Sequence, residues 1–172
     1  LFRSFGLAES AHYEKAEAVG RAAVAADPGN PGAVHAVAHV MEMQGRARDG
    51  VEWLEATLQG WIDSTGYAVH LWWHLALFHL ELNQPLQAMA IYDDRIRAGR
   101  RENASALVDA TAFLWRAGLH GLDVGQRWTE LADCWERKPI SGLRLFTDVH
   151  AVLAFVATGR TASARRRQQE LA

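Results

Sequence analysis

Apolar residues recur along the chain at spacings of three and four, and runs that alternate residue by residue between apolar and polar are nearly absent. This period matches an α-helix and not a β-strand. The four prolines, at positions 28, 31, 85 and 139, each stand where an apolar-periodic segment begins or ends. The pattern therefore predicts an all-α protein built from short helices.

Small residues recur at a period near that of a known helical repeat. Ala16, Gly50 and Ala88 are separated by 34 and 38 residues. A period of 34 is typical of tetratricopeptide-like repeats, in which two antiparallel helices form a hairpin and each hairpin buries its apolar face against its neighbours. Small side chains are needed where the two helices cross. We expect the other small crossing positions at Ala38, Ala76, Ala164 and either Ala151 or Val152, and the bulky partner positions at Val34, Trp72 and Leu107.

Gly45 is expected at the turn between the two helices of one hairpin, and it sets the register for the others. The register divides the chain into five hairpins at about 1–27, 31–59, 67–99, 103–137 and 141–172. We therefore predict one domain over residues 1–172, an α-α superhelix or α-solenoid of tetratricopeptide-like hairpins. The first hairpin begins inside its first helix, so the chain is expected to be a fragment of a longer repeat protein.

Histidines gather at the positions expected to line the concave face of such a solenoid. His35, His39 and Glu42 are spaced four and three residues apart, which places them on one face of a helix. His70 and His74 take groove positions in the next hairpin. With His150, five of the eight histidines fall at such positions, where even placement would put about one or two. The enrichment predicts a histidine-rich concave surface.

Three more residues extend this surface along the chain. Asp109 and His150 stand in the fourth and fifth hairpins at the position that His74 takes in the third. Trp73 is also expected to enter the groove, where an aromatic ring can stack on a ligand. A neutral histidine beside a carboxylate is poised for proton transfer near pH 7. The candidate catalytic residues are His39, His74, Asp109 and His150.

Two His-x-x-x-His pairs face the same groove, and this spacing turns both imidazoles of a pair the same way. Such a set, with nearby carboxylates, suits zinc, iron or manganese. The candidate metal ligands are His35, His39, His70 and His74. Three interpretations stay open: a divalent metal site, a groove that binds or transforms a ligand without metal, and a hydrogen-bonded surface with only a structural role.

Composition and charge exclude several other classes of function. The net charge of −2 over 172 residues favours neither nucleic acid nor an anionic membrane as a partner. No apolar run of about 18 residues exists, so the sequence predicts no membrane span. Cys134 is the one cysteine, which fits a reducing compartment, and it is interpreted as a core residue. No glycine-rich phosphate loop and no Gly-x-Ser-x-Gly motif occur.

Longer motifs carry a family resemblance. The chain contains "FGLAESAHYEKAEAVGRAAVAADPGNPGAVHAVAHVMEMQGRARDGVEWL", then "HLWWHLALFHLELNQPLQAMAIYDDRI", "LVDATAFLWRAGLHGLDVGQRW" and "LFTDVHAVLAFVATGR". Over nearly all of its length it resembles the tetratricopeptide repeat protein 38 family. The resemblance implies an all-helical repeat protein of the cytoplasm, several hundred residues long, of which this chain is the middle part. It implies no particular reaction or substrate.

The family motifs share polar residues with this chain that nearly coincide with the groove set. They are His35, His39, Glu42, His70, His74, Asp109, Asp148 and His150. Asp148 is new, and its register is a packing position, where it would orient a neighbour such as His150. The first functional hypothesis is a scaffold whose groove, lined by these residues and Trp73, binds a polar ligand or a protein or peptide segment. The alternatives are an enzyme that uses the same residues for acid–base or metal-assisted chemistry, and a purely architectural fragment.

Overall fold

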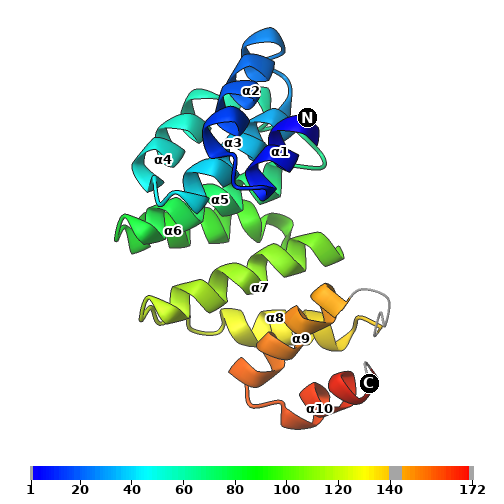
Figure 1. Cartoon of the computed structure of the whole chain (residues 1–172). Helices are drawn as coiled ribbons and strands as arrows, with labels where there is room; N and C mark the ends of the chain where they lie inside the picture. The colour runs from blue at the N-terminus through cyan, green and yellow to red at the C-terminus, as the bar shows by residue number, and fades with distance from the viewer. Residues whose placement is uncertain (1, 140–144, 171–172) are drawn as a thin grey trace. The chain divides into compact units, whose positions relative to one another are not determined.

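The structure is a computed structural model that describes residues 2–139 and 145–170, and these residues are helical with connecting turns (Figure 1). No strand occurs among them, which confirms the predicted all-α class. The α-helices are α1 (Phe2–Glu9), α2 (Tyr13–Ala26), α3 (Pro31–Met43), α4 (Ala47–Ala56), α5 (Ala68–Glu81), α6 (Pro85–Ile91), α7 (Ala104–Leu119), α8 (Arg127–Glu136), α9 (Leu145–Ala157) and α10 (Thr161–Gln169). Three short turns of other helical types are η1 (Leu58–Gly60), η2 (Tyr92–Ile96) and η3 (Ala98–Arg100).

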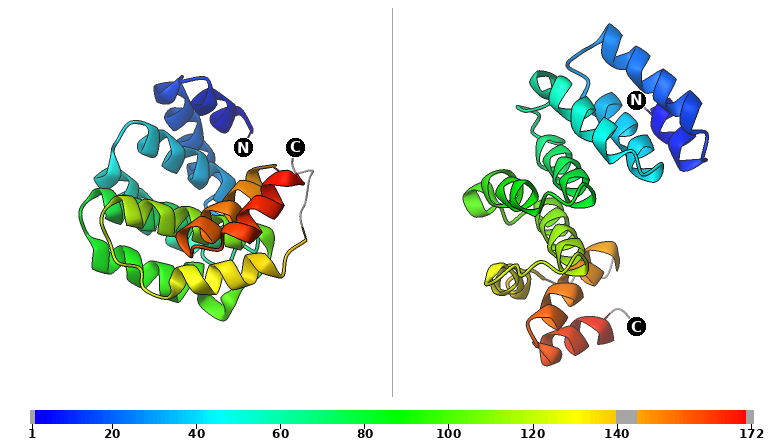
Figure 2. Two further views of the ribbon diagram at one scale, coloured as in Figure 1. Left: turned by 90° about the horizontal axis from the view of Figure 1, so that it is seen from below. Right: turned by 90° about the vertical axis from the view of Figure 1, so that its left-hand side faces the viewer.

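Consecutive helices pair as the repeat register predicts. Within the described residues α1 packs on α2, α3 on α4, α5 on α6, α7 on α8 and α9 on α10 (Figure 2). The start predicted for the fifth hairpin, at residue 141, lies outside the described residues. The local hairpins are therefore observed, while their assembly into one superhelix stays a prediction.

The described residues group into two compact units, Leu1–Ile91 and Tyr92–Ala172, and each is described by itself. The boundary lies inside the third hairpin, where α6 ends and the π-helical turn η2 begins. The first unit contains α1 to α6, and the second contains α7 to α10. The single domain over 1–172 stays a prediction.

Helix starts and turns follow local signals in the sequence. The side chain of Asn30 accepts a hydrogen bond from the backbone N–H of Ala33 at 3.1 Å, and Pro31 occupies the first turn of α3. Asn103 caps α7 in the same way. Gly45, the predicted turn glycine, has φ +65°, a left-handed conformation that glycine adopts at little cost. These signals fix where α3 begins and where it turns into α4.

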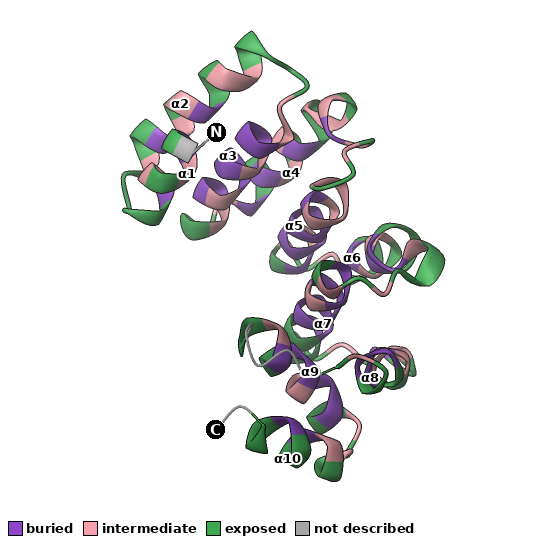
Figure 3. Ribbon diagram, turned by 90° about the vertical axis from the view of Figure 1, so that its right-hand side faces the viewer, coloured by how far each residue is buried: buried purple, intermediate pink, exposed green. Residues whose placement is uncertain are grey.

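The core of the first unit lies among α3, α4 and α5. Val34 and Met41 of α3 pack with Leu54 of α4 and with Leu71 and Phe78 of α5, and all five are fully buried (Figure 3). The small residues expected at helix crossings are also buried: Ala16, Ala38, Gly50, Ala76, Ala88, Ala151 and Ala164. The shared core holds α3 beside α5, and this pair of helices carries the candidate site.

In the described part of the chain, no helix combines the length and the apolar character that crossing a membrane requires.

Candidate metal centre

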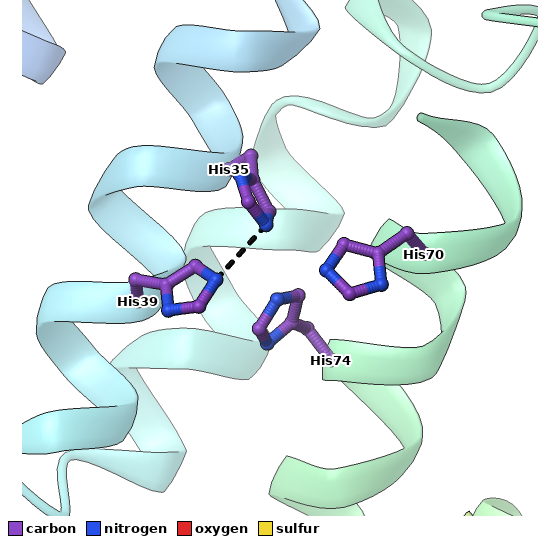
Figure 4. A group of neighbouring side chains, drawn as sticks. All are labelled: His35, His39, His70 and His74. Atoms are coloured by element: carbon purple, nitrogen blue, oxygen red, sulfur yellow. Dashed lines mark hydrogen bonds between the residues drawn. The ribbon is translucent and has the colours of Figure 1, made fainter. Parts of the chain in front are cut away.

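Helices α3 and α5 each present two histidines to one point. His35 and His39 lie one turn apart on α3, and His70 and His74 lie one turn apart on α5 (Figure 4). On an α-helix, residues four apart share a face. The opposite faces of both helices are apolar and buried in the shared core, so the histidine faces meet beside it.

The structure brings these four side chains together as one histidine cluster: His35, His39, His70 and His74. One ring nitrogen from each can be chosen so that all four lie within 4.8 Å of one another. Nε2 of His39 and Nε2 of His35 form a hydrogen bond of 3.0 Å. Between the helices, the ring centroids of His39 and His74 are 4.7 Å apart, and those of His35 and His70 are 4.9 Å apart.

These separations are close to those of a tetrahedral metal site. Zn–N bonds of about 2.0–2.1 Å place neighbouring ligand nitrogens about 3.3–3.4 Å apart in a tetrahedron. The largest separation in the histidine cluster, 4.8 Å, exceeds this edge by about 1.5 Å. An ion between the two helices would require the ring nitrogens to approach one another by about this amount.

Burial favours the neutral form of His35 and His39. His74 is fully buried, while His35, His39 and His70 are half-buried. Burial, and then the neighbouring imidazoles of the cluster, lower the pKa of His35 to about 2. Burial also lowers the pKa of His39, although the Glu42 carboxylate opposes that shift. A neutral imidazole has a lone pair available, which is the form that binds a metal ion.

Aromatic rings enclose the cluster. Phe5 of α1 stacks on His35 with centroids 5.8 Å apart, and Tyr67, just before α5, lies 5.6 Å from the same ring. Trp73 stacks on His70 at 5.2 Å and is buried, so it forms one wall of the cluster, and its place in a ligand groove stays a prediction. Phe5 and Tyr67 were not predicted, because neither occupies a groove position of the repeat.

Glu42 completes the arrangement on the α3 side. Its Oε2 lies 3.0 Å from Nδ1 of His74, and its side chain is 24% exposed. The predicted face of His35, His39 and Glu42 is thus observed, and it meets His74 of α5. A metal ion in the cluster would have four nitrogen ligands and one carboxylate nearby.

The remaining predicted site residues belong to the second unit. Asp109 lies in α7, and Asp148 and His150 lie in α9, a helix that packs on α7. All three are buried. Nδ1 of His150 donates a hydrogen bond of 2.7 Å to the carbonyl oxygen of Phe146. The predicted row of His74, Asp109 and His150 is divided between the two units and stays a prediction.

Asp148 has a partner that the sequence did not reveal. Its Oδ1 accepts a hydrogen bond of 2.8 Å from Nη1 of Arg167 in α10, and both side chains are buried. Arg167 also donates to the carbonyl oxygens of Trp135 and Lys138. Asp148 is buried, and its ion pair with Arg167 joins α9 to α10. The place of Asp148 in a ligand groove stays a prediction.

No family model matches the chain, and no solved structure matches it. The resemblance to the tetratricopeptide repeat protein 38 family stays a prediction from sequence motifs.

Proposed function

We propose that the first unit binds one divalent transition-metal ion through the imidazoles of the histidine cluster, His35, His39, His70 and His74. The observation that carries the proposal is the convergence of four ring nitrogens, two from each of two helices, within 4.8 Å. Convergence to one point is the arrangement that a four-coordinate ion requires.

Packing alone gives a weaker account of the cluster. Imidazole is polar, and moving it out of water costs free energy that hydrogen bonds such as the one between His35 and His39 offset. Apolar side chains would fill the space between α3 and α5 without that cost, as Leu71 and Val34 do one position away in the sequence. Four neutral imidazoles side by side instead supply four lone pairs, which a metal ion uses and a core does not need.

The ligand set favours a particular class of metal. Imidazole nitrogen suits zinc, copper, nickel and iron, whereas magnesium and calcium prefer oxygen ligands. No thiol lies in the first unit, because Cys134 is the chain's one cysteine. Zinc is the simplest probe, since it is redox-inert and accepts four imidazoles in a tetrahedron.

The ion would act as a cross-link between neighbouring hairpins. Two ligands come from α3, in the second predicted hairpin, and two come from α5, in the third. Four protein ligands complete a tetrahedron, which is the arrangement of structural sites, whereas catalytic zinc keeps a position for water. We therefore propose a tetratricopeptide-like helical repeat in which a metal ion joins two adjacent hairpins. This is in keeping with the resemblance to the tetratricopeptide repeat protein 38 family.

Titration of chelator-treated protein with zinc, followed by calorimetry, tests the proposal. The protein should bind one zinc ion per chain. His39→Gln should lose this binding, and His12→Gln should retain it, because His12 is exposed and lies outside the cluster. Absence of zinc binding to the natural chain, or equal binding by His39→Gln, would contradict the proposal.

A second candidate function follows from the exposure of three cluster members. Because His35, His39 and His70 are half-buried, the ion would lie near the surface, where a polar ligand or a carboxylate of a partner segment could replace one imidazole. In this version of the groove-binding hypothesis, the ligand binds directly to the metal ion. Addition of acetate or imidazole to the cobalt-loaded protein tests it. A change in the visible cobalt bands supports the replacement, and unchanged bands at saturating additive refute it.

A further inference from the structure

We infer that Glu42 positions His74 for metal binding, by accepting the Nδ1–H of that ring so that its Nε2 lone pair faces the other three imidazoles. The inference rests on the proposed function, and it assigns the carboxylate a role beside the metal ligands rather than among them.

The geometry separates Glu42 from the ligand set. Oε2 of Glu42 lies 3.0 Å from Nδ1 of His74, which is hydrogen-bonding distance. The four nitrogens that converge belong to the histidines alone. Since the carboxylate lies beside Nδ1, the other ring nitrogen of His74, Nε2, is the one left for the ion.

His74 is the ring that most needs an orienting partner. It is the one fully buried member of the cluster, and it lies within 5.2 Å, centroid to centroid, of His35, His39 and His70. A neutral imidazole carries one N–H and one lone pair, so the partner of one nitrogen decides which nitrogen is free to bind metal. A carboxylate oxygen accepts hydrogen bonds, so Glu42 favours the tautomer of His74 with its proton on Nδ1.

The charge of Glu42 adds a second effect. Four neutral imidazoles leave the full charge of a divalent ion uncompensated in a partly buried site. A carboxylate behind a ligating imidazole raises the basicity of that ligand and offsets part of the charge. Glu42 supplies this from α3, three residues after His39, while the ligand that it orients lies on α5. The contact therefore couples the two helices even before an ion binds.

Zinc affinity of Glu42→Gln tests this role, because glutamine keeps the shape of the side chain and removes its charge. The affinity should fall about 10–100-fold, with one ion still bound per chain. Glu17→Gln is the matched control, since Glu17 lies in the same unit and pairs with Arg46, away from the cluster. It should bind zinc as the natural chain does.

A structural role for Glu42 would give a different result. A purely structural role would change the unfolding free energy of the zinc-free and zinc-loaded proteins equally, whereas a positioning role also lowers the gain in stability that zinc provides. Nitrogen-15 NMR of the zinc-loaded natural chain gives a second readout, with Nδ1 of His74 protonated and Nε2 bound. Zinc ligation through Nδ1 of His74, or an unchanged zinc affinity of Glu42→Gln, would overturn this inference but not the proposed metal site. Failure of the natural chain to bind zinc overturns the proposed function with it.

Discussion

The Nε2 atoms of His35 and His39 lie 3.0 Å apart, one turn apart on α3, and form a hydrogen bond. Such a bond needs a proton on one Nε2 and a lone pair on the other. A metal ion between the rings needs lone pairs on both, so its binding moves one proton to Nδ1. The same geometry therefore satisfies the zinc-free cluster and directs both nitrogens to the place where an ion would bind.

Removal of His74 should separate packing from ligation. His74→Ala leaves a cavity beside the core and should lower the zinc-free unfolding free energy by about 2–4 kcal/mol, as large-to-small core substitutions do. His70→Ala removes a half-buried ring stacked on Trp73 and should cost about 1 kcal/mol. Urea denaturation with and without zinc measures both effects. Zinc should stabilise the natural chain and neither variant, and a zinc gain retained in either one would argue against ligation by that residue.

The ion pair of Glu17 with Arg46 should make stability depend on pH below neutrality. Hydrogen bonding to Arg46 holds the pKa of the Glu17 carboxyl below its usual value near 4.5. A lowered folded-state pKa contributes stability that is fully present above the unfolded-state pKa and is lost as the pH falls through the folded-state pKa. Glu17→Gln should therefore cost about 0.5–1 kcal/mol at pH 7 and progressively less below about pH 4.5.

Thermal unfolding of both proteins across pH 3 to 7 measures this difference. The two stability curves should converge toward the acid end, because the natural carboxyl becomes neutral there. A constant difference over the whole range would show that glutamine perturbs packing rather than charge.

Gly50 should tolerate no larger side chain. A Cβ at this position of α4 would collide with the ring of Phe78 on α5. Gly50→Ala should lower the unfolding free energy by about 1–3 kcal/mol, the usual cost of overpacking. Gly6→Ala is the control, because a Cβ there meets nothing within 4 Å and alanine is the better helix former. The control should raise stability slightly, and an equal loss in both variants would contradict the close approach of α4 to α5.

The buried pair of Asp148 and Arg167 should be essential to the second unit. Arg167→Ala leaves a buried carboxylate without its cation and should cost about 3–5 kcal/mol. Arg165→Ala, on an exposed position of the same helix, should change stability by less than about 0.5 kcal/mol. Chemical denaturation compares them. A small effect of Arg167→Ala would show that the pair does not hold α9 to α10.

The hairpins could be predicted because their signals are local. Asn30 and Pro31 begin α3, Gly45 ends it, and small residues stand at every predicted crossing. The two histidine pairs could be predicted because four-residue spacing fixes a shared face within one helix. Their meeting followed from the register of neighbouring hairpins, which places His70 and His74 opposite His35 and His39.

The other contacts of the two sites depend on side-chain positions that the repeat register does not predict. Phe5 reaches His35 from α1, whose place in the repeat was incomplete in the sequence. The register places Trp73 at a groove position but does not predict that its ring stacks on His70 and is buried. Arg167 lies nineteen residues beyond Asp148, on another helix. In the sequence it is one of three consecutive arginines, 165 to 167, which are typical of a solvent-exposed helix face. Side-chain rotation and packing decide these contacts, and spacing alone does not predict them.

The most direct test of the proposed metal site is X-ray diffraction at the zinc absorption edge from crystals of the natural chain grown with equimolar zinc. We predict one strong anomalous peak between α3 and α5, about 2.0–2.1 Å from a ring nitrogen of each of His35, His39, His70 and His74. A map without a peak among these four rings, while zinc is bound elsewhere or not at all, would contradict the account.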